Sequence, residues 1–219
     1  MRNGKKPGAA PSVEIREERR TLTLEGTPVL TYTLMWPEIA GGGLGGRWIN
    51  GYYRRLARAW RLRWQREVYW QACIDLAGRS EEGISFLPWS GKLTAEITAQ
   101  DGDLLSLRLV GEEVRSGGKV CRVRWGDTWS VREGAPLPFR SVLPEGRNAV
   151  TARLVEQGEA RRTAGDLFLD PGWETALART LPLRDFCVTE TGVELAFPQA
   201  LFSPAAEGHP VFTLPFGAQ

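Results

Sequence analysis

Apolar and polar residues alternate over most of the first third of the chain. Val13 and Ile15 alternate with charged residues, and the turn signal Gly26-Thr27-Pro28 follows a second alternating run. Side chains two residues apart point to the same face of a strand. The pattern therefore predicts a hairpin of two strands joined near residues 26–28. Four apolar residues share one face of the second strand: Leu30, Tyr32, Leu34 and Trp36.

The pattern changes to a period of three or four between Arg47 and Gly78. Ile49, Tyr52, Leu56 and Trp60 recur at this spacing, with arginines between them. This periodicity is typical of an amphipathic helix of about eight turns. We expect it to end near Gly78 and to pack these four residues against a sheet.

The rest of the chain predicts short strands with helices inserted between them. Three strands around 93–99, 105–109 and 121–125 are joined by Asp-Gly and Gly-Gly turns, which predicts an antiparallel meander. A broken helix follows over 145–180, interrupted at Pro171-Gly172, and a strand pair then turns at Thr191-Gly192. Strands in groups separated by helices indicate an α+β fold with an antiparallel sheet, packed against one long helix and a shorter broken one.

The segment after this strand pair is rich in proline and apolar residues. Pro198 ends the returning strand, because proline cannot donate a hydrogen bond to its neighbour. Leu201 and Phe202 are expected to be buried in a crossing loop. The final apolar residues, 211–214, predict a last edge strand that Pro215 stops.

Composition limits the remaining possibilities only loosely. The chain has 219 residues, 42% of them hydrophobic, and a net charge of +2, which is ordinary for a globular protein. We expect a disordered lead at 1–11 and one domain at 12–217, with possible sub-lobes at 12–80 and 81–217. The sequence contains neither a signal peptide nor an apolar run long enough to span a membrane. This predicts a cytoplasmic protein, or one of the cell envelope if an anchor has been lost.

The residues that often carry chemistry are scattered along the chain. Cys73, Cys121 and Cys187 lack CxxC spacing, and His209 alone cannot complete a zinc site. Each thiol is expected to be buried and reduced. We therefore expect neither a metal nor a cofactor.

Two short motifs formally match catalytic or binding patterns. Gly41 to Gly46 match a dinucleotide-binding fingerprint, but the neighbouring strands predict an antiparallel arrangement rather than the parallel unit that it needs. Ser116 and Lys119 match S-x-x-K, yet the two glycines between them predict a hairpin turn. The carboxylate pairs at turns are interpreted as solvating charges. The sequence thus indicates a protein that is not an enzyme.

The predicted long helix is strongly basic. Seven arginines and no acidic residue lie between Arg47 and Arg66, with tryptophans among them. A solvated helix face is the simplest interpretation, since arginine side chains also cover apolar surface. Such a face is also suited to an acidic protein or cell-wall polymer, and less so to nucleic acid. The candidate partner surface consists of Arg54, Arg58, Arg61 and Trp64.

Several segments resemble the RsiV-like domain family. The last thirty residues carry most of the resemblance, with Phe197-Pro198, the loop Ala205-Ala206-Glu207-Gly208 and the closing Pro215-Phe216. The segment "TWSVREGAPLPFRSVL" and the Trp48-Ile49-Asn50 sequence also resemble the family. This domain of unknown function occurs in extracytoplasmic parts of bacterial anti-sigma factors and beside peptidoglycan deacetylase domains. Some of its members sense lysozyme.

The chain also departs from the family pattern. Ser116-Gly117-Gly118-Lys119 replaces Gly-Gly-Ala-His, and neither the aspartate near Ser130 nor the tyrosine after Phe197-Pro198 is present. No recognition residue is therefore transferred from the family.

We consider three functional hypotheses. The resemblance and the lack of an assembled catalytic set favour a non-catalytic binding or sensing module, with a protein or cell-wall polymer as its partner. The alternatives are a cell-wall or glycan hydrolase and a nucleic-acid-associated protein that uses the arginine-rich helix. Convergent acids in a cleft would favour the hydrolase, and a continuous arginine face flanked by exposed tryptophans would favour nucleic acid.

Overall fold

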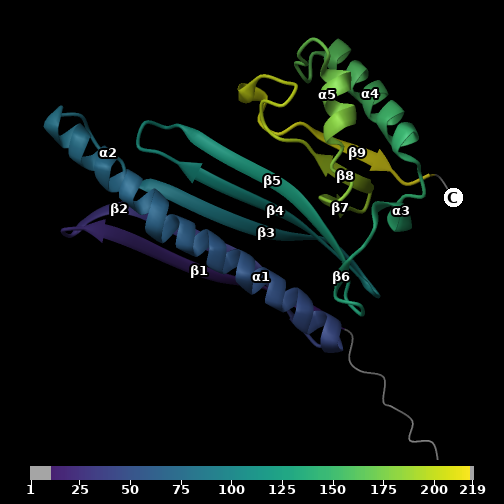
Figure 1. Cartoon of the computed structure of the whole chain (residues 1–219), viewed down its shortest axis with the longest axis horizontal. Coiled ribbons are helices and arrows are strands. Elements are labelled where there is room, and N and C mark those ends of the chain that lie inside the picture. Colours follow the sequence, from purple (N-terminus) through teal and green to yellow (C-terminus); the bar gives the residue numbers. More distant parts are fainter. Residues whose placement is uncertain (1–10, 218–219) are drawn as a thin grey trace, which may run out of the picture.

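The computed structural model describes residues 11–217 (Figure 1). The predicted lead at 1–11 lies outside the described residues, except for Pro11. The chain forms two lobes, each with its own sheet, and the prediction of an α+β fold is confirmed. None of the described helices is both long enough and apolar enough to span a membrane.

The larger sheet has six strands in the order β1-β2-β3-β4-β5-β6. The predicted hairpin and the predicted meander are both present and antiparallel. The pairing of β2 with β3 is parallel, however, which the prediction of an antiparallel sheet did not include. The strands of this sheet are β1 (Ser12–Leu24), β2 (Thr27–Ala40), β3 (Trp89–Asp101), β4 (Leu104–Val114), β5 (Val120–Ser130) and β6 (Ala135–Pro136).

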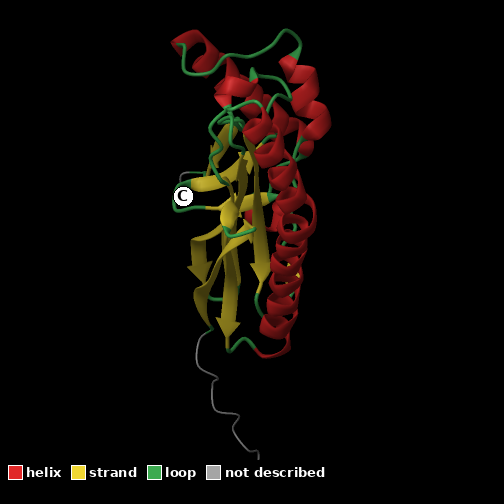
Figure 2. Cartoon of the chain, turned by 90° about the vertical axis from the view of Figure 1, so that its left-hand side faces the viewer, coloured by secondary structure: helices red, strands yellow, loops and turns green. Residues whose placement is uncertain are grey.

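The parallel pairing results from the long helix between β2 and β3. It consists of α1 (Gly43–Arg63), a π-helical turn η1 (Trp64–Val68) and α2 (Tyr69–Glu81), which follow one another without a gap. At 1.5 Å per residue it is roughly 58 Å long, so it carries the chain back to the start of β2. A crossover of this kind makes the next strand parallel. The helix lies along one face of the sheet (Figures 1 and 2).

The buried stripe of the helix differs from the predicted one. Ile49 is fully buried as expected, but Tyr52, Leu56 and Trp60 are only partly buried. Their places in the core are taken by residues one or four positions further along: Tyr53, Ala57 and Trp64. The helix also continues three residues beyond Gly78, to Glu81.

The glycine run before the helix has a packing role. A Cβ atom on Gly45 would lie 2.0 Å from the Val131 carbonyl oxygen. Gly42 and Gly43 adopt left-handed backbone angles, which glycine accommodates without strain. The run therefore lets the start of the helix pack against the turn after β5.

The second lobe has its own three-stranded sheet, in the order β7-β8-β9. This differs from the prediction that all strands share a single sheet. The predicted broken helix is present as two helices that pack beside this sheet, and its own cluster of apolar residues forms the core of the lobe (Figure 1). The elements are α3 (Phe139–Val142), α4 (Arg147–Ala164), α5 (Trp173–Thr180), β7 (Phe186–Val188), β8 (Gly192–Ala196), a 3-10 turn η2 (Ala205–Glu207) and β9 (Val211–Pro215).

The proline-rich segment near the C-terminus forms the predicted crossing loop and closing strand. Phe202 of the loop is buried, and β9 pairs antiparallel with β8. Phe212 and Leu214 are buried in the core of the lobe. Arg161 of α4 also donates to the Val211 carbonyl oxygen at 2.8 Å. The end of the chain is thus part of the folded core.

The two lobes meet where β7 crosses the face of the large sheet that is opposite the helix. A Cβ atom on Gly126 would lie 2.2 Å from the Phe186 carbonyl carbon, so glycine permits this close approach. The Thr128 hydroxyl donates to the Phe186 carbonyl at 2.9 Å, and the Ser106 hydroxyl accepts from the Val188 amide at 2.7 Å. Backbone groups of β7 are thereby satisfied within the seam.

A buried carboxylate completes this seam. Glu194 of β8 accepts hydrogen bonds from Arg108 at 2.8 Å and from Arg124 at 2.6 Å. Desolvation would raise the pKa of Glu194, but the hydrogen bonds and charges of the two arginines outweigh it, so the pKa is lowered. The carboxylate is therefore charged when it joins β4 and β5 to the second lobe.

Removing β9 should unfold the second lobe. Truncation after Gly208 takes away Phe212 and Leu214, each worth about 1.5–3 kcal/mol of burial, and leaves β8 with an unpaired edge. We expect aggregation or loss of the cooperative transition in thermal denaturation. Truncation after Pro215 keeps β9 and serves as the control. A cooperative transition within a few degrees of the full chain after the longer truncation would contradict this role of β9.

Replacing Glu194 should destabilise the contact between the lobes. Glu194→Ala leaves Arg108 and Arg124 without their buried partner, at an expected cost of about 3 kcal/mol in unfolding free energy. Glu96 also contacts Arg108, at 2.8 Å, but its side chain is 63% exposed. Glu96→Ala should therefore cost less than about 1 kcal/mol. Equal effects of the two variants in urea denaturation would show that burial of Glu194 is unimportant.

Candidate functional site

The outer edge of β5 is only partly covered by β6. The two strands pair only at Trp129 and Ser130. The part of β5 before Trp129 forms only single hydrogen bonds along this edge. The Leu137 amide donates to the Thr128 carbonyl at 2.8 Å, and the Gly126 amide donates to the Asp185 carbonyl at 3.3 Å. These contacts leave space between the strand, the helix and the loop before β7.

A cavity of 500 Å³ occupies this space. We call it the sheet-edge cavity. Its walls come from α1, β5, the segment around β6 and the loop that precedes β7. It is lined by Tyr52, Asp127, Thr128, Trp129, Pro136, Leu137, Pro138, Leu183, Arg184 and Asp185.

Asp127 is the most unusual ionisable group in this cavity. Burial raises its pKa to about 6; a hydrogen bond from Tyr53 opposes this shift, and the nearby Asp185 carboxylate adds to it. The Tyr53 hydroxyl donates to Asp127 Oδ2 at 2.9 Å and accepts from Trp129 Nε1 at 2.8 Å. This chain of hydrogen bonds fixes the carboxylate between the helix and the sheet.

Aromatic side chains form one wall of the cavity. The Tyr52 ring lies 5.1 Å from the Trp129 ring and 5.0 Å from the Tyr53 ring, measured between centroids. Burial, with the charges of Asp127 and Asp185, raises the pKa of Tyr52 to about 12. Its hydroxyl is therefore protonated at neutral pH. The cavity thus combines apolar walls with a few placed polar groups, which is typical of ligand-binding sites.

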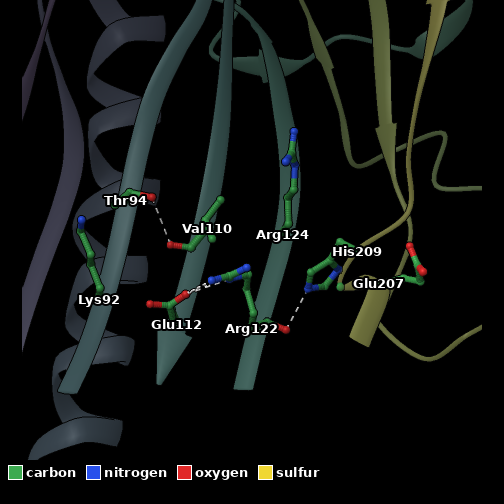
Figure 3. A pocket seen from close by; sticks show the side chains of 9 residues that line it. Lys92, Thr94, Val110, Glu112, Arg122, Arg124, Glu207 and His209 are labelled. Atoms are coloured by element: carbon green, nitrogen blue, oxygen red, sulfur yellow. Dashed lines mark hydrogen bonds and ion pairs between the residues drawn. The ribbon is translucent and has the colours of Figure 1, made fainter. Parts of the chain in front are cut away.

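A second cavity, of 430 Å³, lies on the opposite face of the large sheet (Figure 3). We call it the loop cavity, because residues 207–209 close one side of it. Arg122 and Glu112 point toward each other across it and form an ion pair. Lys92 lies at its far side. Since two of its charged groups already neutralise each other, it is less suited to hold a ligand than the sheet-edge cavity.

His209 closes the loop cavity at β5. Its Nδ1 lies 2.9 Å from the Phe197 carbonyl oxygen, and its Nε2 lies 2.9 Å from the Arg122 carbonyl oxygen. The histidine thus ties the loop before β9 to the edge of the large sheet, and it has a structural role.

The residues predicted as a partner surface do not form one surface. Trp64 is fully buried: its ring packs over Gly91, and its Nε1 donates to Glu113 at 3.0 Å. Arg61 is held by Glu18 at 2.5 Å, and Arg54 lies 3.5 Å from Glu38. Arg58 is exposed. Trp64 therefore belongs to the core, because its side chain lies on the side of the helix that packs against the sheet.

The three cysteines differ in environment. Cys73 and Cys187 are buried, but Cys121 is exposed at the start of β5, which contradicts the prediction for that residue. Burial, followed by the charge of Glu194, raises the pKa of Cys187 to about 12, so it stays a thiol. Within residues 11–217, no three histidine, cysteine, aspartate or glutamate side chains are grouped so that they could hold a metal ion.

Neither Asp127 nor Tyr52 was predicted from the sequence as a site residue. One signal was available: Asp127 alternates with Trp125 and Trp129 and so falls on the core-facing side of its strand. A carboxylate on the core-facing side of a strand loses contact with water, and carboxylates are seldom placed there without a hydrogen-bonding or charged partner. Asp185 gave no such signal, because only the packing of the second lobe brings it to β5.

Comparison with known proteins relates the chain to others by its fold. The sequence matches no protein-family model and no curated protein. A crystal structure of a DUF3298 family member from Bacteroides fragilis is similar with a TM-score of 0.70 and 14% identity, covering 96% of this chain and 92% of that one. A DUF3298 family protein from Pseudomonas aeruginosa is similar with a TM-score of 0.53 and 15% identity, covering 96% and 91%.

Protonation of Asp127 should stabilise the folded protein. Its pKa is about 6 in the folded state, against about 3.9 in an unfolded chain. The stabilisation is thus fully present below about pH 4 and is lost as pH rises through about 6. Relative to Asp127→Asn, the wild type should lose about 3 kcal/mol of unfolding free energy between about pH 4 and pH 7.5.

Urea denaturation of both proteins across this range measures the difference directly. Titrating groups far from Asp127 affect the two proteins alike, so their contributions cancel in the comparison. Parallel pH profiles would mean that Asp127 has an unperturbed pKa.

Proposed function

We propose that the protein is a non-catalytic binding module whose ligand occupies the sheet-edge cavity. The observation that carries this proposal is the partly buried carboxylate of Asp127, with its raised pKa, in a cavity that is also lined by Tyr52 and several apolar residues. A buried ionisable group with a raised pKa in a cleft is a common mark of a functional site. The hydrogen bond from Tyr53 holds the carboxylate in one orientation, as recognition of a ligand requires.

The lining indicates the chemistry of the ligand. Asp127 and Asp185 offer acceptors for hydroxyl or amide hydrogens, and Tyr52 offers a ring face for an apolar surface. A sugar ring has both features, with hydroxyls at its edge and C–H groups on its faces. We therefore propose an amino-sugar glycan of the bacterial cell wall as the ligand.

The resemblance to the RsiV-like domain supports this ligand class, since that domain occurs beside peptidoglycan deacetylase domains. The fold shared with two DUF3298 family proteins is compatible with it. The proposal favours a location in the cell envelope over the cytoplasm.

A glycan hydrolase is the second candidate. It is favoured by the pair of carboxylates at one cavity, one of them with a pKa of about 6, which suits a general acid. In the proposed binding module, Asp127 accepts hydrogen bonds and transfers no proton.

Binding of soluble N-acetylglucosamine oligomers, measured by calorimetry, tests the proposal. Tyr52→Ala and Asp127→Asn should each weaken binding at least about tenfold, because each removes a ring face or a charged acceptor. Lys92→Ala, in the loop cavity, is the matched control and should bind as the wild type does. Loss of binding only in Lys92→Ala, or no binding by the wild type, would overturn the proposal.

An assay for new reducing ends separates the two candidates. The binding module leaves the oligomers intact over long incubation. Release of reducing ends by the wild type, abolished in Asp127→Asn, would instead identify a hydrolase.

A further inference from the structure

The side of the long helix that faces away from the sheet carries a continuous stripe of exposed side chains. We call it the outer stripe. Successive members of the stripe are three, four, seven or eight residues apart in the sequence, so they share one side of the helix. They are Trp48, Arg55, Arg58, Arg66, Trp70 and Ile74, all exposed.

The outer stripe is long. From Trp48 to Ile74 it spans roughly 39 Å at 1.5 Å per residue. The helix lies on the outside of the sheet, whose other face is occupied by the second lobe (Figures 1 and 2). A flat partner can therefore reach the whole stripe without contact with either cavity.

The arginines of the helix divide into two groups. Arg61 and Arg63 are bound to glutamates of the sheet, Glu18 and Glu113. Arg55, Arg58 and Arg66 of the outer stripe form no ion pair with any carboxylate of the described chain. The ion pairs of the helix involve its other arginines, Arg54, Arg61, Arg63 and Arg79. Their charge is directed outward, which complements a negatively charged partner.

Both ends of the outer stripe are apolar. Trp48 is 66% exposed at one end, and Trp70 and Ile74 are 59% and 72% exposed at the other. Leu44, one turn before Trp48, is 71% exposed. Large apolar side chains grouped in this way commonly mark a surface that another partner covers.

We propose that the outer stripe binds the surface of an anionic lipid bilayer. The arginines then lie at the lipid phosphates, and the tryptophans with Leu44 and Ile74 enter the interface, as in amphipathic helices that lie in the membrane plane. Single-stranded nucleic acid also attracts arginine and stacks on tryptophan. Leu44 and Ile74, however, have no aromatic face for stacking, whereas aliphatic side chains enter the apolar part of a bilayer interface.

This interaction goes beyond the proposed function, since no residue of the outer stripe lines the sheet-edge cavity. It would place the sheet-edge cavity near a membrane without occupying it.

Vesicle sedimentation tests the proposal with the full chain. The protein should bind vesicles of phosphatidylcholine with phosphatidylglycerol, and binding should fall as salt is raised. The triple variant Arg55→Glu, Arg58→Glu, Arg66→Glu should bind at least about 100-fold more weakly. The charge-matched control Arg19→Glu, Arg140→Glu, Arg162→Glu alters exposed arginines on other elements and should bind as the wild type does.

A second variant, Trp48→Ala with Trp70→Ala, should weaken vesicle binding about tenfold. Both side chains are exposed, so the fold should persist, and thermal denaturation verifies this. Three results would overturn the proposal: no binding to anionic vesicles, equal binding to pure phosphatidylcholine vesicles, or equal losses in the two triple variants. Binding to a single-stranded oligonucleotide but to no vesicle would identify nucleic acid as the partner instead.

Discussion

The close contact of β7 with the face of the large sheet determines the arrangement of the rest of the molecule. It depends on Gly126, whose missing side chain lets the backbone of Phe186 approach, and on Glu194, which is held between Arg108 and Arg124. An apolar seam would have left the backbone groups of β7 without partners. Hydroxyls of Ser106 and Thr128 satisfy them instead. Two sheets with separate apolar cores are thereby joined by a polar seam.

The same contact brings the functional elements together at β5. Asp185 immediately precedes β7, so docking of β7 carries it to the edge of β5, opposite Asp127. His209 holds the same edge further along. An exposed strand edge invites pairing with another chain, and here single contacts protect it in place of a continuous neighbouring strand. The sheet-edge cavity is the space that these contacts leave open.

The long helix has two different sides. Its inner side fills the core with Ile49, Tyr53 and Trp64, and Tyr52 on its flank lines the sheet-edge cavity. Its outer side carries arginines without carboxylate partners in the described chain, between exposed apolar residues. One element therefore connects the two proposed surfaces. A ligand in the cavity and a partner on the outer stripe would contact different residues of the same helix.

Local pattern was enough to predict the strands, the long helix and the closing strand at 211–215, because alternation and helical periodicity reflect which residues have to be buried. It also gave the α+β class. The predicted set of buried helix residues was wrong in part, since Tyr52 and Tyr53, or Trp60 and Trp64, are equally apolar. Trp64 packs over Gly91 and Trp60 over Gly111, and only the tertiary structure makes Trp64 the fully buried one. The parallel pairing of β2 with β3 and the split into two sheets depend on how far the helix carries the chain. The site depended most on tertiary structure: Asp127 and Asp185 are distant in sequence, and only the docking of β7 brings them to one cavity.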